Sequence, residues 1–164
     1  MKRFFLALNH GYYFWGTSIY VGLLWALHFI FYPSWKSITP DSVQEHFMVP
    51  VNAATAFFTI VVPVMLFSGL VMICSEWKNG KKITTIAAYL SLLLMMIVGY
   101  FLIKPINDAV AKSIADKTLD SPHLAAQLAD WMFYNDLRLV IMTAMWMILL
   151  YYFYKKNDLY HSLA

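Results

Sequence analysis

Residues 12–32 read "YYFWGTSIYVGLLWALHFIFY", an apolar run without any lysine, arginine, aspartate or glutamate. An α-helix needs about 20 such residues to cross a hydrocarbon core of about 30 Å. The run is continuous and lacks the alternation of apolar and polar residues that marks a membrane strand. It therefore predicts a helix that crosses a membrane.

Three further runs of this kind follow, at about residues 51–74, 83–103 and 137–154. Hydrophobic residues make up 61% of the 164-residue chain and charged residues only 13%. A typical soluble domain is about 25% charged, and a soluble bundle this small could not make its exposed surface so apolar. We therefore predict an all-α fold in which residues 1–164 form one integral membrane domain, an up-down-up-down four-helix bundle.

The lysine and arginine residues between the runs predict the orientation of the bundle. Seven would lie on the side of the termini: Lys2, Arg3, Lys78, Lys81, Lys82, Lys155 and Lys156. Four would lie on the other side: Lys36, Lys104, Lys112 and Lys117. Because basic residues gather on the cytoplasmic side, we expect a multi-pass protein of the cell membrane with both termini in the cytoplasm.

The longer connections between the runs would then lie outside the cytoplasm. In one of them, Ile106, Val110 and Ile114 recur at helical spacing, which predicts an amphipathic helix on the outer surface. Further along, Ser121 and Pro122 are typical of an N-cap and a first-turn proline, and they predict the start of a helix that leads into the fourth run. We expect these outer segments to form an extracytoplasmic cap.

Small residues indicate how the helices connect and pack. Asn79 and Gly80 form a pair typical of a helix stop and a turn, which predicts an antiparallel hairpin of the second and third runs. In the first run, Ser18, Gly22 and Ala26 recur every four residues. We expect this face to approach another helix closely, because small side chains let two backbones come together in a membrane.

Polar residues follow one face of the helix that enters the fourth run. Trp131, Asn135 and Arg138 are spaced by four and three residues, which places them on the same side of a helix. A guanidinium that faced lipid would cost several kcal/mol, so we predict that Arg138 points into the bundle. An inward Arg138 needs partners, and an ion pair with Asp108 or Asp136 is expected. The full set of candidates is Asp130, Asn135 and Asp136 on the same helix and Asn107 or Asp108 at the end of the third run.

The other three runs supply polar residues at the same membrane depth. His28 lies near the outer end of the first run, Asn52 at the outer start of the second and Asn107 just after the third. Together with Arg138 and its neighbours, these residues predict a polar pocket at the outer ends of the helices.

Simpler interpretations of each residue stay open. Arg138 would also serve as a structural ion pair or an interfacial anchor, His28 as a packed core histidine, and Asn107 as a helix cap. The methionines suit copper(I), but flexible membrane core is the commoner role of such residues: Met95, Met96, Met142, Met145 and Met147.

Several function classes find no support in the sequence. It contains no C-x-x-C or H-E-x-x-H motif, and we expect neither a metal nor a cofactor. The basic residues are scattered, which argues against nucleic acid as a partner. The expected partners are the lipid bilayer and a small apolar molecule. A transporter of this size would need to form a homo-oligomer to make a path.

Two short motifs resemble a known family. "IKPIND" at residues 103–108 and "WMFYNDLRLV" at residues 131–140 are similar to the anthrone-oxygenase-like family of small four-span membrane proteins. The shared pattern is Pro-x-Asn at the end of the third span and a Trp…Asn…Arg series entering the fourth. The matching residues here are Pro105, Asn107, Trp131, Asn135 and Arg138.

The resemblance implies an oxygenase that oxidises a small apolar aromatic substrate without a cofactor. In that hypothesis His28 is the base and Arg138 the cation that steadies the enolate. The substrate-binding residues would be Asn52, Asn107, Trp131 and Asn135. Two alternatives belong to other classes: a non-enzymatic membrane binding or accessory protein, and a redox protein associated with haem or quinone.

Overall fold

The structure is a computed structural model that describes residues 2–78 and 80–161. All regular structure in these residues is helical, which confirms the all-α prediction. The α-helices are α1 (Lys2–Ala26), α2 (Tyr32–Trp35), α3 (Val49–Glu76), α4 (Lys82–Val98), α5 (Lys104–Ala115) and α6 (Ser121–His161). Three π-helical turns join some of them: η1 (Leu27–Phe31), η2 (Gln44–Met48) and η3 (Gly99–Ile103).

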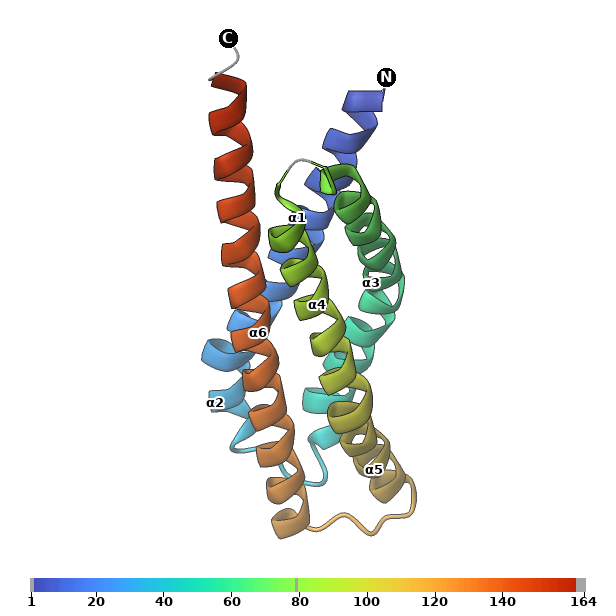
Figure 1. Ribbon diagram of the computed structural model, residues 1–164. Helices are drawn as coiled ribbons and strands as arrows, with labels where there is room; N and C mark the ends of the chain where they lie inside the picture. The colour runs from blue at the N-terminus through green and yellow to red at the C-terminus, as the bar shows by residue number, and fades with distance from the viewer. Residues whose placement is uncertain (1, 79, 162–164) are drawn as a thin grey trace.

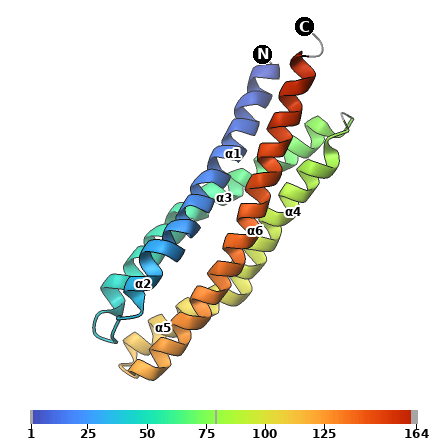
Figure 2. The ribbon, with the colours of Figure 1, turned by 90° about the vertical axis from the view of Figure 1, so that its left-hand side faces the viewer.

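Adjoining elements merge into four long helices, and these form a ring. Successive long helices run in opposite directions, so that both ends of the chain and the α3–α4 connection lie at one end of the molecule (Figures 1 and 2). Helix α1 packs against α3 and α6, and α4 packs against the same two helices. Each long helix therefore contacts its neighbours in sequence, and the last closes the ring on the first.

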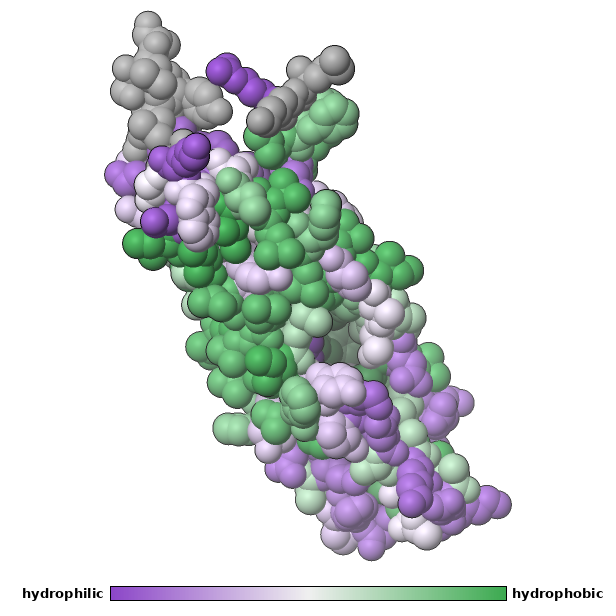
Figure 3. All heavy atoms as spheres, turned by 45° about the vertical axis from the view of Figure 1, so that its right-hand side comes forward, coloured by the Kyte–Doolittle hydropathy of each residue, from purple (hydrophilic) through white to green (hydrophobic). Residues whose placement is uncertain are grey.

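The four long helices are each long and apolar enough to cross a membrane. They cover Arg3–Trp35, Gln44–Glu76, Lys82–Ala115 and Ser121–Lys156, and each predicted span lies inside one of them. Their outward side chains are apolar and strongly exposed, as at Ile60, Phe67 and Val140. Figure 3 shows the result on one face, where a broad hydrophobic band separates two hydrophilic ends.

Each π-helical turn comes shortly before a proline. In each turn a backbone N–H donates to the carbonyl oxygen five residues back: Tyr32 to Leu27, Val49 to Gln44, and Lys104 to Gly99. The next residue is Pro33, Pro50 and Pro105, respectively. A proline lacks the N–H group and its ring clashes with the carbonyl four residues back, and a wider π turn accommodates this. All three turns lie at the end of the bundle away from the termini (Figure 1).

The buried side chains form two clusters along the bundle. One lies toward the termini and includes Met65, Met142 and Met145, all fully buried. The second lies at the opposite end, where the ring centroids of Trp35, Phe47 and Trp131 are 5.1 to 5.2 Å apart. Burial of aromatic side chains in this way holds the ends of the long helices together.

Helix α5 and the start of α6 complete this second cluster. Val110 of α5 is fully buried while Ile106 and Ile114 pack against the cluster, so the predicted amphipathic helix is present. Helix α5 continues the direction of α4. The start of α6 differs by one residue from the prediction: Asp120 Oδ1 accepts a hydrogen bond from His123 N–H at 2.8 Å. Asp120 is therefore the N-cap, and Ser121 is the first helical residue.

The expectation of close packing at Gly22 is wrong. Gly22 is exposed, and a methyl group added to it would meet nothing within 4 Å. The close approaches occur at Gly16, where such a group would lie 2.8 Å from Met65, and at Gly69, where it would lie 2.7 Å from Tyr89. In the predicted turn, Gly80 has a φ of +70°, in the left-handed region that favours glycine; Asn79 lies outside the described residues.

Candidate binding site between the helices

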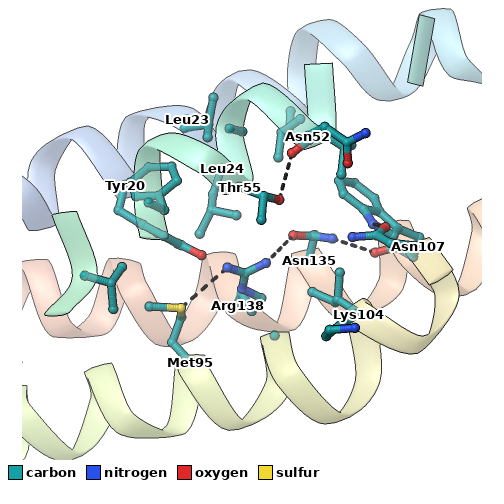
Figure 4. Close-up of a pocket in the computed structure, with 18 of the residues that line it drawn as sticks. Tyr20, Leu23, Leu24, Asn52, Thr55, Met95, Lys104, Asn107, Asn135 and Arg138 are labelled. Atoms are coloured by element: carbon teal, nitrogen blue, oxygen red, sulfur yellow. Dashed lines mark hydrogen bonds between the residues drawn. The ribbon is translucent and has the colours of Figure 1, made fainter. Parts of the chain in front are cut away.

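A cavity of about 560 Å³ lies between the helices, in the half of the bundle away from the termini. All four long helices line it, mainly with apolar side chains. Small-molecule sites have volumes of about 300–1,000 Å³ and combine apolar walls with a few polar groups. Figure 4 shows Asn135 and Arg138 facing Leu24 and Thr55 across this space. The cavity therefore has the size and the lining of a ligand site.

Arg138 points into the bundle from α6 and is held by neighbours on three helices. Its Nη1 donates to Asn135 Oδ1 at 3.0 Å, and its Nη2 donates to the Met95 sulfur at 3.5 Å. The guanidinium carbon lies 5.2 Å from the ring centroid of Tyr20 on α1, a cation–π distance. The guanidinium also lies close to Gly99 of η3. A methyl group added to Gly99 would be 3.8 Å from the guanidinium.

A chain of hydrogen bonds connects Arg138 to α5. Asn135, only 1% exposed, accepts from Arg138 and donates from Nδ2 to the Trp131 carbonyl at 2.9 Å. Trp131 Nε1 in turn donates to Asn107 Oδ1 at 2.8 Å. The spacing that puts Trp131, Asn135 and Arg138 on one helical face thus aligns the three side chains. Asn107, which follows Pro105 and η3, joins them to the third long helix.

Arg138 has no carboxylate partner among the described residues, and the predicted pairing with Asp108 or Asp136 is wrong. Asp108 pairs with Lys104, one turn earlier on α5. Asp136 pairs with His28, with Oδ1 2.8 Å from Nδ1. Arg138 Nε is buried without an acceptor. The charge of Arg138 is therefore balanced by no acidic side chain within the part of the chain that the structure describes.

His28 lies outside the cavity. It faces Asp136 between α1 and α6, and the two side chains are 39% and 41% exposed. Because Asp136 lies two residues before Arg138, it projects from a different side of α6. The other five predicted site residues all line the cavity: Asn52, Asn107, Trp131, Asn135 and Arg138.

The cavity opens sideways, between α3 and the η3–α5 segment. Most exposed lining residues lie on these two elements, among them Thr55, Thr59 and Pro63 on one side and Tyr100 and Lys104 on the other; Phe31 of η1 is also exposed. Figure 3 shows the hollow in this face, beside the apolar band. The opening therefore lies in the side of the bundle, between two of its long helices.

The sequence does not single out several residues that shape the site. Tyr20, Met95 and Gly99 surround the guanidinium, but each lies in an apolar run where nothing distinguishes it from lipid-facing neighbours. Pro50 and Pro105 are visible in the sequence, and prolines beside apolar runs signal broken or widened helical turns. The consequence, a π turn at each, is visible only in the structure.

A second polar cluster, also missed, lies at the end of the bundle that carries the termini. Glu76 Oε1 accepts hydrogen bonds from Tyr152 OH at 2.7 Å and from Lys156 Nζ at 2.6 Å. Lys156 Nζ also lies 3.1 Å from His10 Nδ1, and His10 Nε2 lies 3.1 Å from Ser75 Oγ. An ammonium group only donates, so Nδ1 of His10 accepts and Nε2 carries the proton. This network ties α1, α3 and α6 together.

Comparisons with protein-family models, with curated proteins and with solved structures find no match to this chain. The resemblance to the anthrone-oxygenase-like family therefore stays a hypothesis based on two short motifs.

Proposed function

We propose that this chain is a membrane protein that holds a small, largely apolar molecule in the cavity beside Arg138. The observation that carries the proposal is a space of about 560 Å³ with apolar walls, toward which a few polar groups converge. Protein interiors pack about as densely as organic crystals, so an interior serving stability alone would fill this volume with side chains. The convergence of polar groups on unfilled space favours a binding role.

The proposed setting is the cell membrane, with both termini in the cytoplasm. The exposed apolar side chains on all four long helices support the first part, because lipid is the solvent that such a surface needs. The excess of basic residues near the termini and the α3–α4 connection supports the second. A ligand would then reach the cavity from the hydrocarbon side, through the opening between α3 and η3.

Oxygenation of an anthrone-type substrate is a second hypothesis, and one observation favours it. Arg138 faces the cavity, where a cation would stabilise an enolate. The base that such a reaction requires is less well placed, because His28 points elsewhere. Asp108 is the one imidazole or carboxylate group among the described lining residues, and Lys104 holds it. Oxygen consumption by purified protein with an added anthrone tests the hypothesis, and a rate equal to that of empty lipid nanodiscs would reject it.

Haem held between two histidines has less support. His10 and His28 lie on the same continuous helix, 18 residues apart in sequence (28 − 10), which corresponds to about 27 Å at a rise of about 1.5 Å per residue. They do not face one another at one depth. A neutral quinone, by contrast, belongs to the class of largely apolar molecules that the cavity would accept.

Filling the cavity provides the test of binding. Ala54 lines the cavity, whereas its neighbour Ala53 is exposed on the outer side of α3. The protein in lipid nanodiscs would be photolabelled with adamantyl diazirine, an apolar probe, and the labelled residues located by mass spectrometry. We expect saturable labelling of cavity residues, which Ala54→Trp abolishes and Ala53→Trp preserves. Labelling that rises linearly with probe concentration at every residue, as for dissolved lipid, would reject the proposal.

A further inference from the structure

We infer that the molecule held in the cavity is the anion of a lipid-soluble organic acid, with its acidic head against Arg138. The inference rests on the proposed function, since it concerns the same cavity, and it adds the chemical class of the ligand. It follows from the charge of the lining, from the unused hydrogen-bond donors of Arg138 and from the distribution of apolar side chains.

The charge of the lining is unbalanced by one positive unit. The charged residues that line the cavity are Lys104, Asp108 and Arg138. Lys104 and Asp108 neutralise one another in an exposed pair. This leaves the guanidinium, which faces apolar walls and has no carboxylate partner among the described residues. A charge in such surroundings is costly unless it is paired, and an anionic ligand would provide the missing partner.

Most hydrogen-bond donors of Arg138 also lack a strong acceptor. A guanidinium carries five N–H donors. Among the described residues, one is accepted by the Asn135 amide oxygen and one by the Met95 thioether, a weak acceptor. The planar arrangement of the remaining N–H groups on Nη1 and Nη2 suits a carboxylate or a similar oxyanion, which accepts two of them at once. Asn135 holds the guanidinium in place for this contact.

Apolar side chains surround the other parts of the cavity. Leu23, Leu24, Phe58 and Val62 line it on the side of α1 and α3, and the rings of Phe58 and Tyr20 lie 4.3 Å apart at their centroids. A ligand with its head at Arg138 would therefore place its body against hydrocarbon. This combination of one anionic head and an apolar body describes a lipid-soluble organic acid. Its access would be sideways, through the opening between α3 and η3.

Water inside the cavity is the alternative source of acceptors, and a pair of matched probes distinguishes the two. The probes are 4-benzoylbenzoate and 4-benzoylbenzamide, which share a photoreactive aromatic body and differ in the charge of the head. Each would be added to the intact protein in nanodiscs, and labelling of Met95 and Met96 would be measured against concentration. We expect the acid to label at a concentration about 10- to 100-fold lower than the amide, the range for hydrogen bonds to a charged group.

Two variants at one position locate the effect. Arg138→Gln removes the charge, so we expect the difference between the labelling concentrations of the acid and the amide to disappear. Arg138→Lys keeps the charge but loses the planar fork, so we expect an intermediate affinity for the acid. Circular dichroism would verify the helical content of each variant. The comparison of acid and amide on the unaltered protein needs no variant and stands even if Arg138→Gln fails to fold.

The outcomes separate this inference from the proposed function. Equal labelling by acid and amide would overturn the anionic ligand and leave binding of an apolar molecule intact. The absence of saturable labelling by both benzoyl probes, with adamantyl diazirine still saturating the cavity, would also overturn it. If all three probes fail to saturate, the proposed function falls as well.

Discussion

Nη1 of Arg138 lies 3.0 Å from Oδ1 of Asn135, one turn earlier on the same face of α6. This bond turns the guanidinium toward the cavity and along the helix, where Met95 and Tyr20 flank it. The Asn135 amide has its other end fixed to the Trp131 carbonyl. The orientation of the Arg138 guanidinium is thus set by a neutral side chain rather than by an ion pair with any described residue.

We expect the contributions of Arg138 and Asn135 to stability to be coupled. Arg138→Leu leaves the buried Asn135 oxygen without its donor, at a cost of about 1–3 kcal/mol. Adding Asn135→Leu removes that unsatisfied group, so the double variant should be more stable than Arg138→Leu alone. The measurement is a double-mutant cycle of unfolding free energies in mild detergent. Additive effects of the two substitutions would show that the bond does not matter for stability.

Gly99 should tolerate alanine but not leucine. A methyl group at Gly99 would lie 3.8 Å from the guanidinium, an ordinary contact, and therefore Gly99→Ala should keep ligand labelling unchanged. The larger side chain of Gly99→Leu would displace the guanidinium, and we expect labelling by the acidic probe to fall about 10-fold or more, comparable to the loss of a charged hydrogen bond. Gly22→Leu is the matched control, because Gly22 faces open space. Equal effects at the two glycines would contradict the prediction.

Trp131→Phe should weaken the connection between α5 and α6. It keeps an aromatic ring in the cluster with Trp35 and Phe47 but loses the hydrogen bond to Asn107 Oδ1. We expect a destabilisation of about 1–2 kcal/mol, measured as a lower Tm in nanodiscs. The exposed Trp15 serves as the control, and Trp15→Phe should change the Tm little. A Tm unaffected by Trp131→Phe would mean that the Asn107 bond contributes nothing.

Tyr152→Phe should destabilise the end of the bundle that carries the termini. The Tyr152 hydroxyl is buried and donates to the Glu76 carboxylate, and a hydrogen bond to a charged group contributes about 1.5–3 kcal/mol. The neighbouring Tyr151 is 56% exposed, so Tyr151→Phe provides a matched control. Thermal unfolding of both variants gives the comparison. The same small shift for both would show that the network around Glu76 is dispensable.

The proposed orientation in the membrane predicts opposite locations for two reporters. A fusion at the C-terminus should report the cytoplasm, because basic residues are concentrated at that end. A fusion inserted within residues 108–120 should report the outer side. Alkaline phosphatase and a fluorescent protein, active on opposite sides, would give complementary signals in cells. Both positions on one side would reject the antiparallel insertion of the bundle, and exchanged positions would reverse its orientation.

The helices and the local faces they carry could be predicted from the sequence. The length of the apolar runs predicts four long helices, since hydropathy depends only on which residues are neighbours in the chain. The alignment of Trp131, Asn135 and Arg138 could be predicted for the same reason, because the helical period fixes it within two turns. The amphipathic spacing around Val110 belongs to this category, and the helix that it predicts is present.

The rotation of each helix and the contacts between distant residues depend on the tertiary structure. The sequence predicts His28 and Asn52 at the same depth, yet only Asn52 lines the cavity, because His28 on η1 faces Asp136 instead. His10 and Lys156 come together across 146 residues. Rotation and pairing follow from the packing of whole helix faces and from the π turns before the prolines. Such contacts join residues far apart in sequence, and no local pattern encodes them.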